Sequence, residues 1–214
     1  MKPNDMDRVL LAHTPVEVVP KFGEFEPLQR NGHRFLVAAD GLWLESKRAW
    51  GRVLWPMAKQ SAVLMPFGRL EQSVELVFGK ELIPHLATFA DDAREADRDE
   101  VGGVVIWHEQ TGSLRYERCE SIHAGVGFLR ARQPAVDEGE HIVVDLHSHG
   151  RLGAGFSGTD LKDTGSEMVL AGVVGRVDRA EPQIVLSLFA CGLQVPCEVG
   201  DALRRACARR VEEV

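Results

Sequence analysis

The chain has 214 residues, of which 44% are hydrophobic and 27% are charged, and its formal net charge is −7. Its length and composition are those of a globular protein with one large or two small domains. The acidic balance argues against sequence-independent binding of nucleic acid, and no segment approaches the about 18 unbroken apolar residues that a membrane span needs. The N-terminus is polar and lacks the apolar core of a signal peptide, so we expect a cytoplasmic protein.

Short apolar runs separated by turns fill residues 31–78, which predicts a small β-rich domain over residues 1–78. Turn residues at Asp40-Gly41 and at Pro66-Phe67-Gly68 separate the runs. The sequence assigns this domain no role. Its three tryptophans fit a hydrophobic core better than a platform for a ligand. They are Trp43, Trp50 and Trp55.

Residues 79–214 predict a second domain of mixed strands and helices, which makes the fold class α+β. The domain opens with a helix from Glu81 to Asp97, because apolar residues recur there at helical spacing. Pro84 falls in the first turn, where proline is tolerated. The stripe consists of Leu82, Leu86, Phe89 and Ala93. Strands are expected from Val101, Leu114, about Phe128, Ile142, Leu170 and Ile184.

A closing helix is expected from Val199 to the C-terminus, with Leu203, Cys207 and Val211 on one face. Its arginines fit a solvated face better than a nucleic-acid patch. They are Arg204, Arg205, Arg209 and Arg210. The four cysteines form no Cys-x-x-Cys pair, which argues against a structural zinc site. Cys191 and Cys197 could meet across a turn, but a reducing compartment favours thiols.

The most informative stretch runs from Asp145 to Asp160. In an extended segment alternate side chains share a face, so His147 and His149 would point the same way. A glycine-rich loop follows, and Ser157 to Asp160 has the pattern of a helix start, which would swing Asp160 back toward the strand. Two imidazoles and one carboxylate are the protein ligands of a catalytic zinc, whose fourth position stays open. A surface histidine pair and a plain capping motif are the alternatives for the two halves taken separately.

His147-Ser148-His149, seven intervening residues and then Ser157-x-x-Asp160 resemble the signature of the JAMM (MPN-plus) metalloproteases. That family also requires an upstream glutamate in the form Glu-x-x-Gly before an apolar strand, and Glu100-Val-Gly-Gly103 fits that form. The resemblance implies a cytidine-deaminase-like domain, a mixed β-sheet flanked by helices. It covers about the C-terminal two thirds of the chain.

The sequence departs from the family pattern beside the histidines. Gly150 stands where proline is usual, Trp107 where a glycine often closes the first strand motif, and Asp145 where an apolar residue is common. None of these changes removes a ligand. Asp145 would share the histidine face and could orient a ring N–H, and a solvated acid at the strand end is the equal alternative.

The resemblance implies one Zn²⁺ per chain, held by His147, His149 and Asp160. Glu100 would be the general base that takes a proton from zinc-bound water, and Ser157 would donate a hydrogen bond to the oxyanion. The implied activity is cleavage of a peptide or isopeptide bond at the C-terminal tail of a ubiquitin-like protein.

An extension of about eighty residues before such a domain resembles the JAMM proteins (protein A) of bacterial PRTRC systems. That narrower resemblance implies two partners, a bacterial ubiquitin-like protein and an E1-like (ThiF-family) enzyme. Two other functions remain open: a metal-free MPN-fold scaffold, and a zinc hydrolase of small amides. A TIM-barrel hydrolase is excluded, because only 65 residues follow His149 and such a barrel needs about 250. The oligomeric state does not follow from the sequence.

Overall fold

The computed structural model describes residues 3–59, 64–125, 128–158 and 167–208. The chain divides into two compact units, Met1–Val77 and Phe78–Val214, each with its own sheet. Strands and helices both contribute, so the predicted α+β class is confirmed. None of the helices in the described ranges combines the length and the apolar composition that crossing a bilayer requires.

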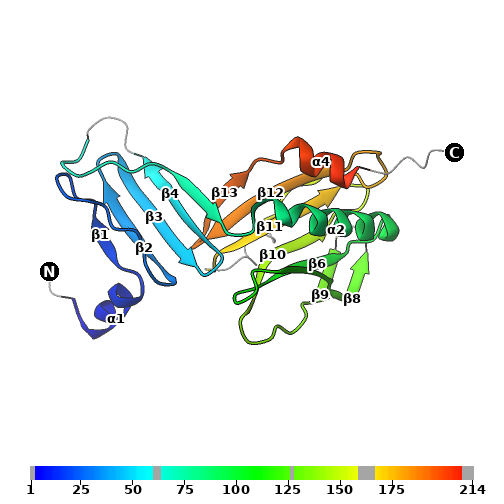
Figure 1. The fold of residues 1–214 in the computed structure, drawn as a ribbon, viewed down its shortest axis with the longest axis horizontal. Helices are drawn as coiled ribbons and strands as arrows, with labels where there is room; N and C mark the ends of the chain where they lie inside the picture. The colour runs from blue at the N-terminus through cyan, green and yellow to red at the C-terminus, as the bar shows by residue number, and fades with distance from the viewer. Residues whose placement is uncertain (1–2, 60–63, 126–127, 159–166, 209–214) are drawn as a thin grey trace. The chain divides into compact units, whose positions relative to one another are not determined.

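The N-terminal unit is a five-stranded sheet in the order β1-β2-β3-β4-β5, preceded by a short helix (Figure 1). β1 pairs parallel with β2, and the remaining neighbours pair antiparallel. The helix begins at a capping box formed by Asn4 and Asp7, and it buries none of its residues. The elements are α1 (Asp5–His13), β1 (Val16–Val18), β2 (Gly32–Ala38), β3 (Gly41–Arg48), β4 (Gly51–Lys59) and β5 (Ser73–Leu76).

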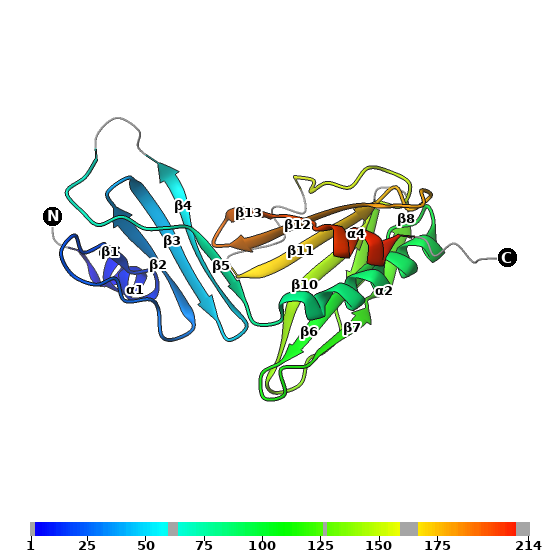
Figure 2. The same cartoon turned by 45° about the horizontal axis from the view of Figure 1, so that its top comes forward.

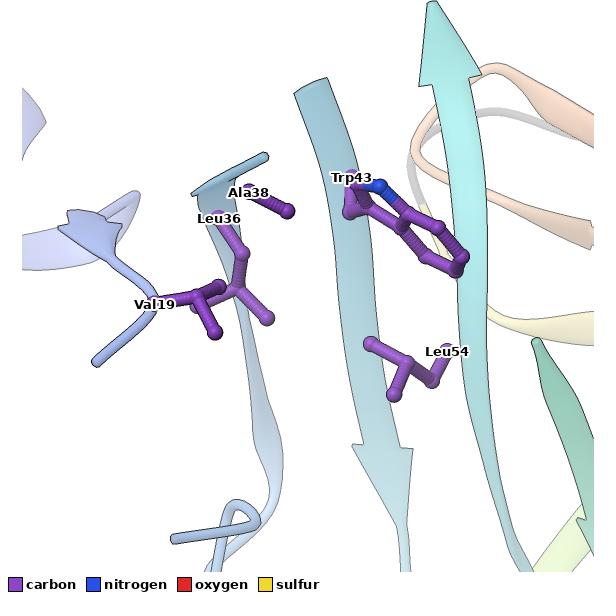
Figure 3. Close-up of a cluster of buried hydrophobic side chains, with 5 residues drawn as sticks. All are labelled: Val19, Leu36, Ala38, Trp43 and Leu54. Carbon is purple, nitrogen blue, oxygen red and sulfur yellow. The ribbon is translucent and has the colours of Figure 1, made fainter. Parts of the chain in front are cut away.

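A hydrophobic cluster forms part of the core of this unit. Figure 3 shows this cluster, which consists of Val19, Leu36, Ala38, Trp43 and Leu54. Trp43 and Trp50 are each 2% exposed, which confirms the predicted core role for these two, and Trp55 is half-buried. The predicted turn before β3 is present: Asp40 accepts a hydrogen bond from the Trp43 indole at 2.9 Å. Gly41 has a φ of +141°, and a Cβ there would lie 2.0 Å from the Ala58 carbonyl oxygen.

The C-terminal unit contains a six-stranded mixed sheet in the order β13-β12-β11-β10-β6-β7 and a separate hairpin, β8-β9. Only β10 and β11 pair parallel, while the other neighbours pair antiparallel. The helical elements are η1 (Gly79–Glu81), α2 (Leu82–Ala96) and α4 (Asp201–Cys207). The strands are β6 (Gly102–His108), β7 (Leu114–Arg118), β8 (Glu120–Gly125), β9 (Phe128–Arg132), β10 (Glu140–Ser148), β11 (Val169–Gly175), β12 (Gln183–Ala190) and β13 (Leu193–Cys197).

Adjacent glycines of β6 define the two faces of this sheet. A Cβ at Gly103 would touch Phe89 of α2, whereas a Cβ at Gly102 would touch Leu129 and Ala131 of β9. Successive strand residues point to opposite faces, so α2 covers one face and the β8-β9 hairpin packs on the other (Figure 2). The predicted stripe of α2 is buried, together with Ala90.

The structure differs from the sequence prediction in several elements. α4 begins at Asp201 rather than Val199, because Gly200 is extended and caps the helix; Val211 lies outside the described residues. Helix α1 was missed because its apolar residues are exposed and give no core-facing pattern. β8 was missed because it is exposed. β13 was missed because it contains Pro196, which only an edge strand accommodates.

Candidate functional site

The candidate site lies at the C-terminal end of β10, between its parallel neighbour β11 and its antiparallel neighbour β6. His147 stands opposite Val173 of β11 and Gly102 of β6. β10 is apolar and buried through Val143, Val144 and Leu146, since a strand with neighbours on both sides faces protein on both faces. The polar side chains therefore collect where the strand ends.

The two histidines of the motif converge as the alternation of a strand predicts. Their Nε2 atoms lie 3.2 Å apart, and the ring centroids lie 5.0 Å apart with an interplanar angle of 51°. Two ligands at about 2.0–2.1 Å from a tetrahedral zinc are themselves about 3.3 Å apart. The spacing of the two imidazoles therefore fits one shared metal ion.

The hydrogen bonds of His149 fix which nitrogen can bind a metal. Nδ1 of His149 lies 3.1 Å from the Gly153 carbonyl oxygen, and a carbonyl only accepts, so Nδ1 carries the proton. In a neutral ring this leaves the Nε2 lone pair available, which is how a backbone carbonyl orients a metal-binding imidazole. The His147 Nε2 then donates to His149, and metal binding requires its proton to move to Nδ1.

The third predicted ligand, Asp160, lies outside the described residues. Within the residues that are described, no group of three His, Cys, Asp or Glu side chains is placed to hold a metal. The described chain thus contributes the two imidazoles of the predicted zinc site. Ser157, the predicted oxyanion donor, is described and exposed, and the predicted helix start from Ser157 to Asp160 extends beyond the described residues.

Glu100 is buried, with 6% exposure, in the connection between α2 and β6. The β10-β6 register pairs Leu146 with Gly103 and His147 with Gly102. The pairing ends there, and one more hydrogen bond, from the Ser148 N–H to the Val101 carbonyl, leaves Glu100 and His149 each next to a bonded residue. The Glu100 backbone N–H donates to the Gly125 carbonyl at 3.4 Å, so the β8-β9 hairpin contacts this connection.

Ser148 joins the two parts of the candidate site, and sequence reasoning overlooked it. It is fully buried, its N–H donates to the Val101 carbonyl at 2.9 Å, and its Oγ accepts from the Val101 N–H at 3.0 Å. Both bonds fasten the residue after Glu100 to the residue between the histidines. Strand alternation was the signal that could have identified it, because Ser148 falls on the same face as the buried Val144 and Leu146, where a polar side chain needs a partner.

The loop after His149 is held in place by backbone contacts. The Leu152 N–H donates to the His149 carbonyl at 2.9 Å, and the Arg176 N–H donates to the Leu152 carbonyl at 2.7 Å. Gly150 has a φ of +52°, and a Cβ there would lie 2.7 Å from the Asp97 carbonyl oxygen. Proline fixes φ near about −65°, so this backbone explains why glycine replaces the usual proline.

An ion pair joins the same two segments, the loop after His149 and the end of α2. Arg151 binds the Asp97 carboxylate through two hydrogen bonds, Nε to Oδ1 at 2.7 Å and Nη2 to Oδ2 at 2.6 Å. The hydrogen bond from Arg151 lowers the pKa of Asp97 below its usual value, and the same bond raises the pKa of Arg151. The Asp97 carboxylate is therefore ionised at neutral pH, as the ion pair requires.

Asp145 is exposed on the histidine side and accepts a hydrogen bond from the Gln133 side chain at 3.1 Å. It also lies near Cys119: burial raises the pKa of that thiol to about 11, and the charges of Asp145 and Glu117 add to the effect. Orientation of a histidine ring by Asp145 stays a prediction. All four cysteines are thiols; Cys197 is the last residue of β13, and Cys191 lies in the turn before that strand begins at Leu193.

Two family models match the chain. Residues 4–77 match a domain of unknown function (DUF2016), and residues 82–187 match the prokaryotic homologs of the JAB domain. No curated protein matches the chain. The JAB match contains Glu100, both histidines, Ser157 and Asp160, so it covers both motifs that carried the resemblance. Residues 82–187 therefore form a domain of the prokaryotic JAB (MPN) homologs, preceded by a DUF2016 domain.

Proposed function

We propose that the protein is a zinc-dependent isopeptidase or peptidase of the JAMM type. The observation that carries this proposal is the 3.2 Å approach of the His147 and His149 Nε2 atoms at the end of β10. Membership of the JAB family supports it. The burial of Glu100, whose neighbour Val101 is hydrogen-bonded to Ser148 between the two histidines, supports it further.

Each residue has a distinct role in the proposed reaction. His147, His149 and Asp160 would hold the metal, which when bound supplies the acidity that makes a water nucleophilic near neutral pH. Glu100 would accept a proton from the attacking water and later protonate the leaving amine. Ser157 would donate a hydrogen bond to the oxygen that becomes negative as the carbonyl is attacked.

For the substrate we propose the C-terminal tail of a bacterial ubiquitin-like protein, either as a precursor or as a conjugate. An E1-like adenylating enzyme would be the second partner. The presence of a DUF2016 domain ahead of the JAB domain is consistent with the resemblance to the PRTRC proteins. The N-terminal unit, with its own sheet and core, is the candidate for partner recognition.

Zinc content tests the metal site directly. We expect about one zinc per chain in the wild type and none in His149→Ala. His141→Ala is the matched control, because His141 lies in the same strand but pairs with Glu109 at 3.3 Å. Absence of zinc from reconstituted wild type would contradict the proposal and favour a metal-free scaffold.

Substrate size then separates the remaining functions. A tail-directed protease should cleave a folded ubiquitin-like fusion much faster than a short peptide with the same tail. Equal rates on both substrates would favour the hydrolase of small amides. Glu100→Ala, which should retain zinc, is the inactive control, whereas Asp160→Ala should lose both zinc and turnover.

A further inference from the structure

Two chain segments meet at the candidate site, and they are cross-linked twice. One segment is the connection from α2 to β6 that carries Glu100, and the other is the end of β10 that carries His149. On one side the Val101 and Ser148 backbones and the Ser148 hydroxyl form two hydrogen bonds. Glu100 and His149 both lie immediately next to this first cross-link.

The second cross-link lies on the other side of the same two residues. The Arg151 guanidinium binds the Asp97 carboxylate at 2.6 and 2.7 Å, in a two-bond fork between residues 54 apart in the chain. Beside it the Gly150 backbone packs so closely that an added Cβ would lie 2.7 Å from the Asp97 carbonyl and 2.8 Å from the Arg98 carbonyl. The segments therefore touch through their backbones, with the ion pair across the contact.

The connection between Asp97 and Glu100 is short and is held by backbone hydrogen bonds. The Asp97 N–H donates to the carbonyls of Ala93 and Arg94, and the Asp99 N–H donates to the Ala96 carbonyl at 3.2 Å. Asp97 has a φ of +56° and a ψ of −86°, an uncommon backbone conformation outside the left-handed helical region. A displacement of Asp97 is thus transmitted to Glu100 over three residues of a hydrogen-bonded turn.

We propose that Asp97 and Arg151 are positioning residues that set the distance between the Glu100 carboxylate and the His149 imidazole. The inference rests on the proposed function for its catalytic consequence, but the cross-link itself can be tested without it. An exposed ion pair by itself stabilises a protein little. Here the ion pair has two hydrogen bonds and joins the two segments that carry Glu100 and His149. A small displacement of either side chain would be costly for catalysis.

Three variants remove the cross-link without imposing a new backbone. Asp97→Asn keeps a side chain of nearly the same shape and removes its charge, Arg151→Gln removes the fork, and the double variant changes both partners. If the two residues act through each other, the double variant should be no worse than the more damaging single variant. Arg151→Lys keeps the charge but loses the planar fork, so it should lie between wild type and Arg151→Gln. Asp91→Asn, which breaks the Asp91–Arg94 pair on the same helix, is the matched control.

The experiment measures three properties of the full-length protein. We expect amide hydrogen exchange to accelerate about tenfold or more at residues 98–103 and 147–152 together, while zinc affinity, measured by chelator competition, falls about 10–100-fold. With a cleavable substrate, kcat should fall by a similar factor and KM should change little. Asp91→Asn should match wild type in all three.

Either of two results overturns the inference. One is unchanged exchange and zinc affinity in both single variants, and the other is a double variant whose losses are the sum of the two. These readouts are separate from the proposed function. If the wild type binds no zinc, the proposed function fails, while hydrogen exchange still decides whether the cross-link couples the two segments.

Discussion

Each of the two units buries a glutamate, and the two differ in what surrounds them. In the N-terminal unit Glu45 is fully buried and accepts hydrogen bonds from Arg34, Arg52 and the Leu28 N–H, all between 2.7 and 2.9 Å. In the C-terminal unit Glu100 is 6% exposed and directly precedes Val101, which is hydrogen-bonded to Ser148 between the two histidines. Guanidinium groups are permanent cations that form stable ion pairs with a carboxylate, whereas imidazoles exchange protons and bind metals. A buried glutamate thus has a specific role, and its neighbours indicate which: arginines indicate a structural ion pair, and histidines indicate a chemical function.

Glu100→Gln should produce the larger effect of this comparison. Glutamine is nearly isosteric but cannot accept the proton, so turnover should fall about 10²–10⁴-fold, while zinc content and the unfolding midpoint stay close to wild type. The measurement is a rate assay on the cleavable fusion, with metal analysis of the same sample. Full activity in this variant would remove Glu100 from the proposed reaction and make it another structural glutamate.

Glu45→Gln should show the opposite pattern. The variant removes the carboxylate that Arg34 and Arg52 share. Their side chains, 11% and 14% exposed, then keep ion pairs with the more exposed Glu17 and Glu75. Removing one partner of a buried ion pair typically costs about 3–5 kcal/mol, which urea unfolding of the full chain would measure. Glu75→Gln is the control, because Glu75 contacts the same Arg52 but is 63% exposed, and it should cost less than about 1 kcal/mol. Equal losses in the two variants would contradict the structural role of Glu45.

The elements that could be predicted are those in which local pattern and burial agree. The stripe of α2 faces the sheet, and the apolar run before His147 forms the centre of it, because periodicity reports which face is buried. The histidine pair could be placed on one face for the same reason. Helix α1 and strand β8 are exposed, so burial leaves no pattern in them.

The contacts that could not be predicted join segments distant in sequence. Ser148 reads as one more polar residue until Val101 is seen to bond to it, 47 residues away. Arg151 and Asp97 likewise have no local signature. Gly150 was noticed only as a departure from the family pattern, and its reason is a backbone contact with the α2-β6 connection. A sequence pattern can name side chains of a site, but the partners that orient them depend on tertiary packing.

Gly150→Ala should have the next largest effect, and it tests whether that backbone contact matters. A non-glycine residue at positive φ costs about 1–3 kcal/mol, and the carbonyls of Asp97 and Arg98 stand where the new Cβ would lie, so the total should be higher. Gly112→Ala is the matched control, since Gly112 has a φ of +69° and open space around it. Comparing the two free energies of unfolding isolates the contact from the backbone. An equal cost in both variants would show that the loop can relax away from Asp97.

The smallest expected effect concerns two thiols whose pKa is shifted more by burial than by the charges around them. Burial raises the pKa of both Cys119 and Cys207 to about 11, against about 8.5 for a free thiol. Because the folded pKa is the higher one, both thiols stay protonated in the folded protein at pH 8, and stability should decline only as pH rises from about 9 to 11, where the unfolded thiols ionise first. A thiol reagent at pH 8 should therefore label these two cysteines slowly in native protein and rapidly in urea. Rapid native labelling of Cys119 would mean that the hairpin over Gly102 opens readily, which would also expose the face on which Glu100 and the histidines lie.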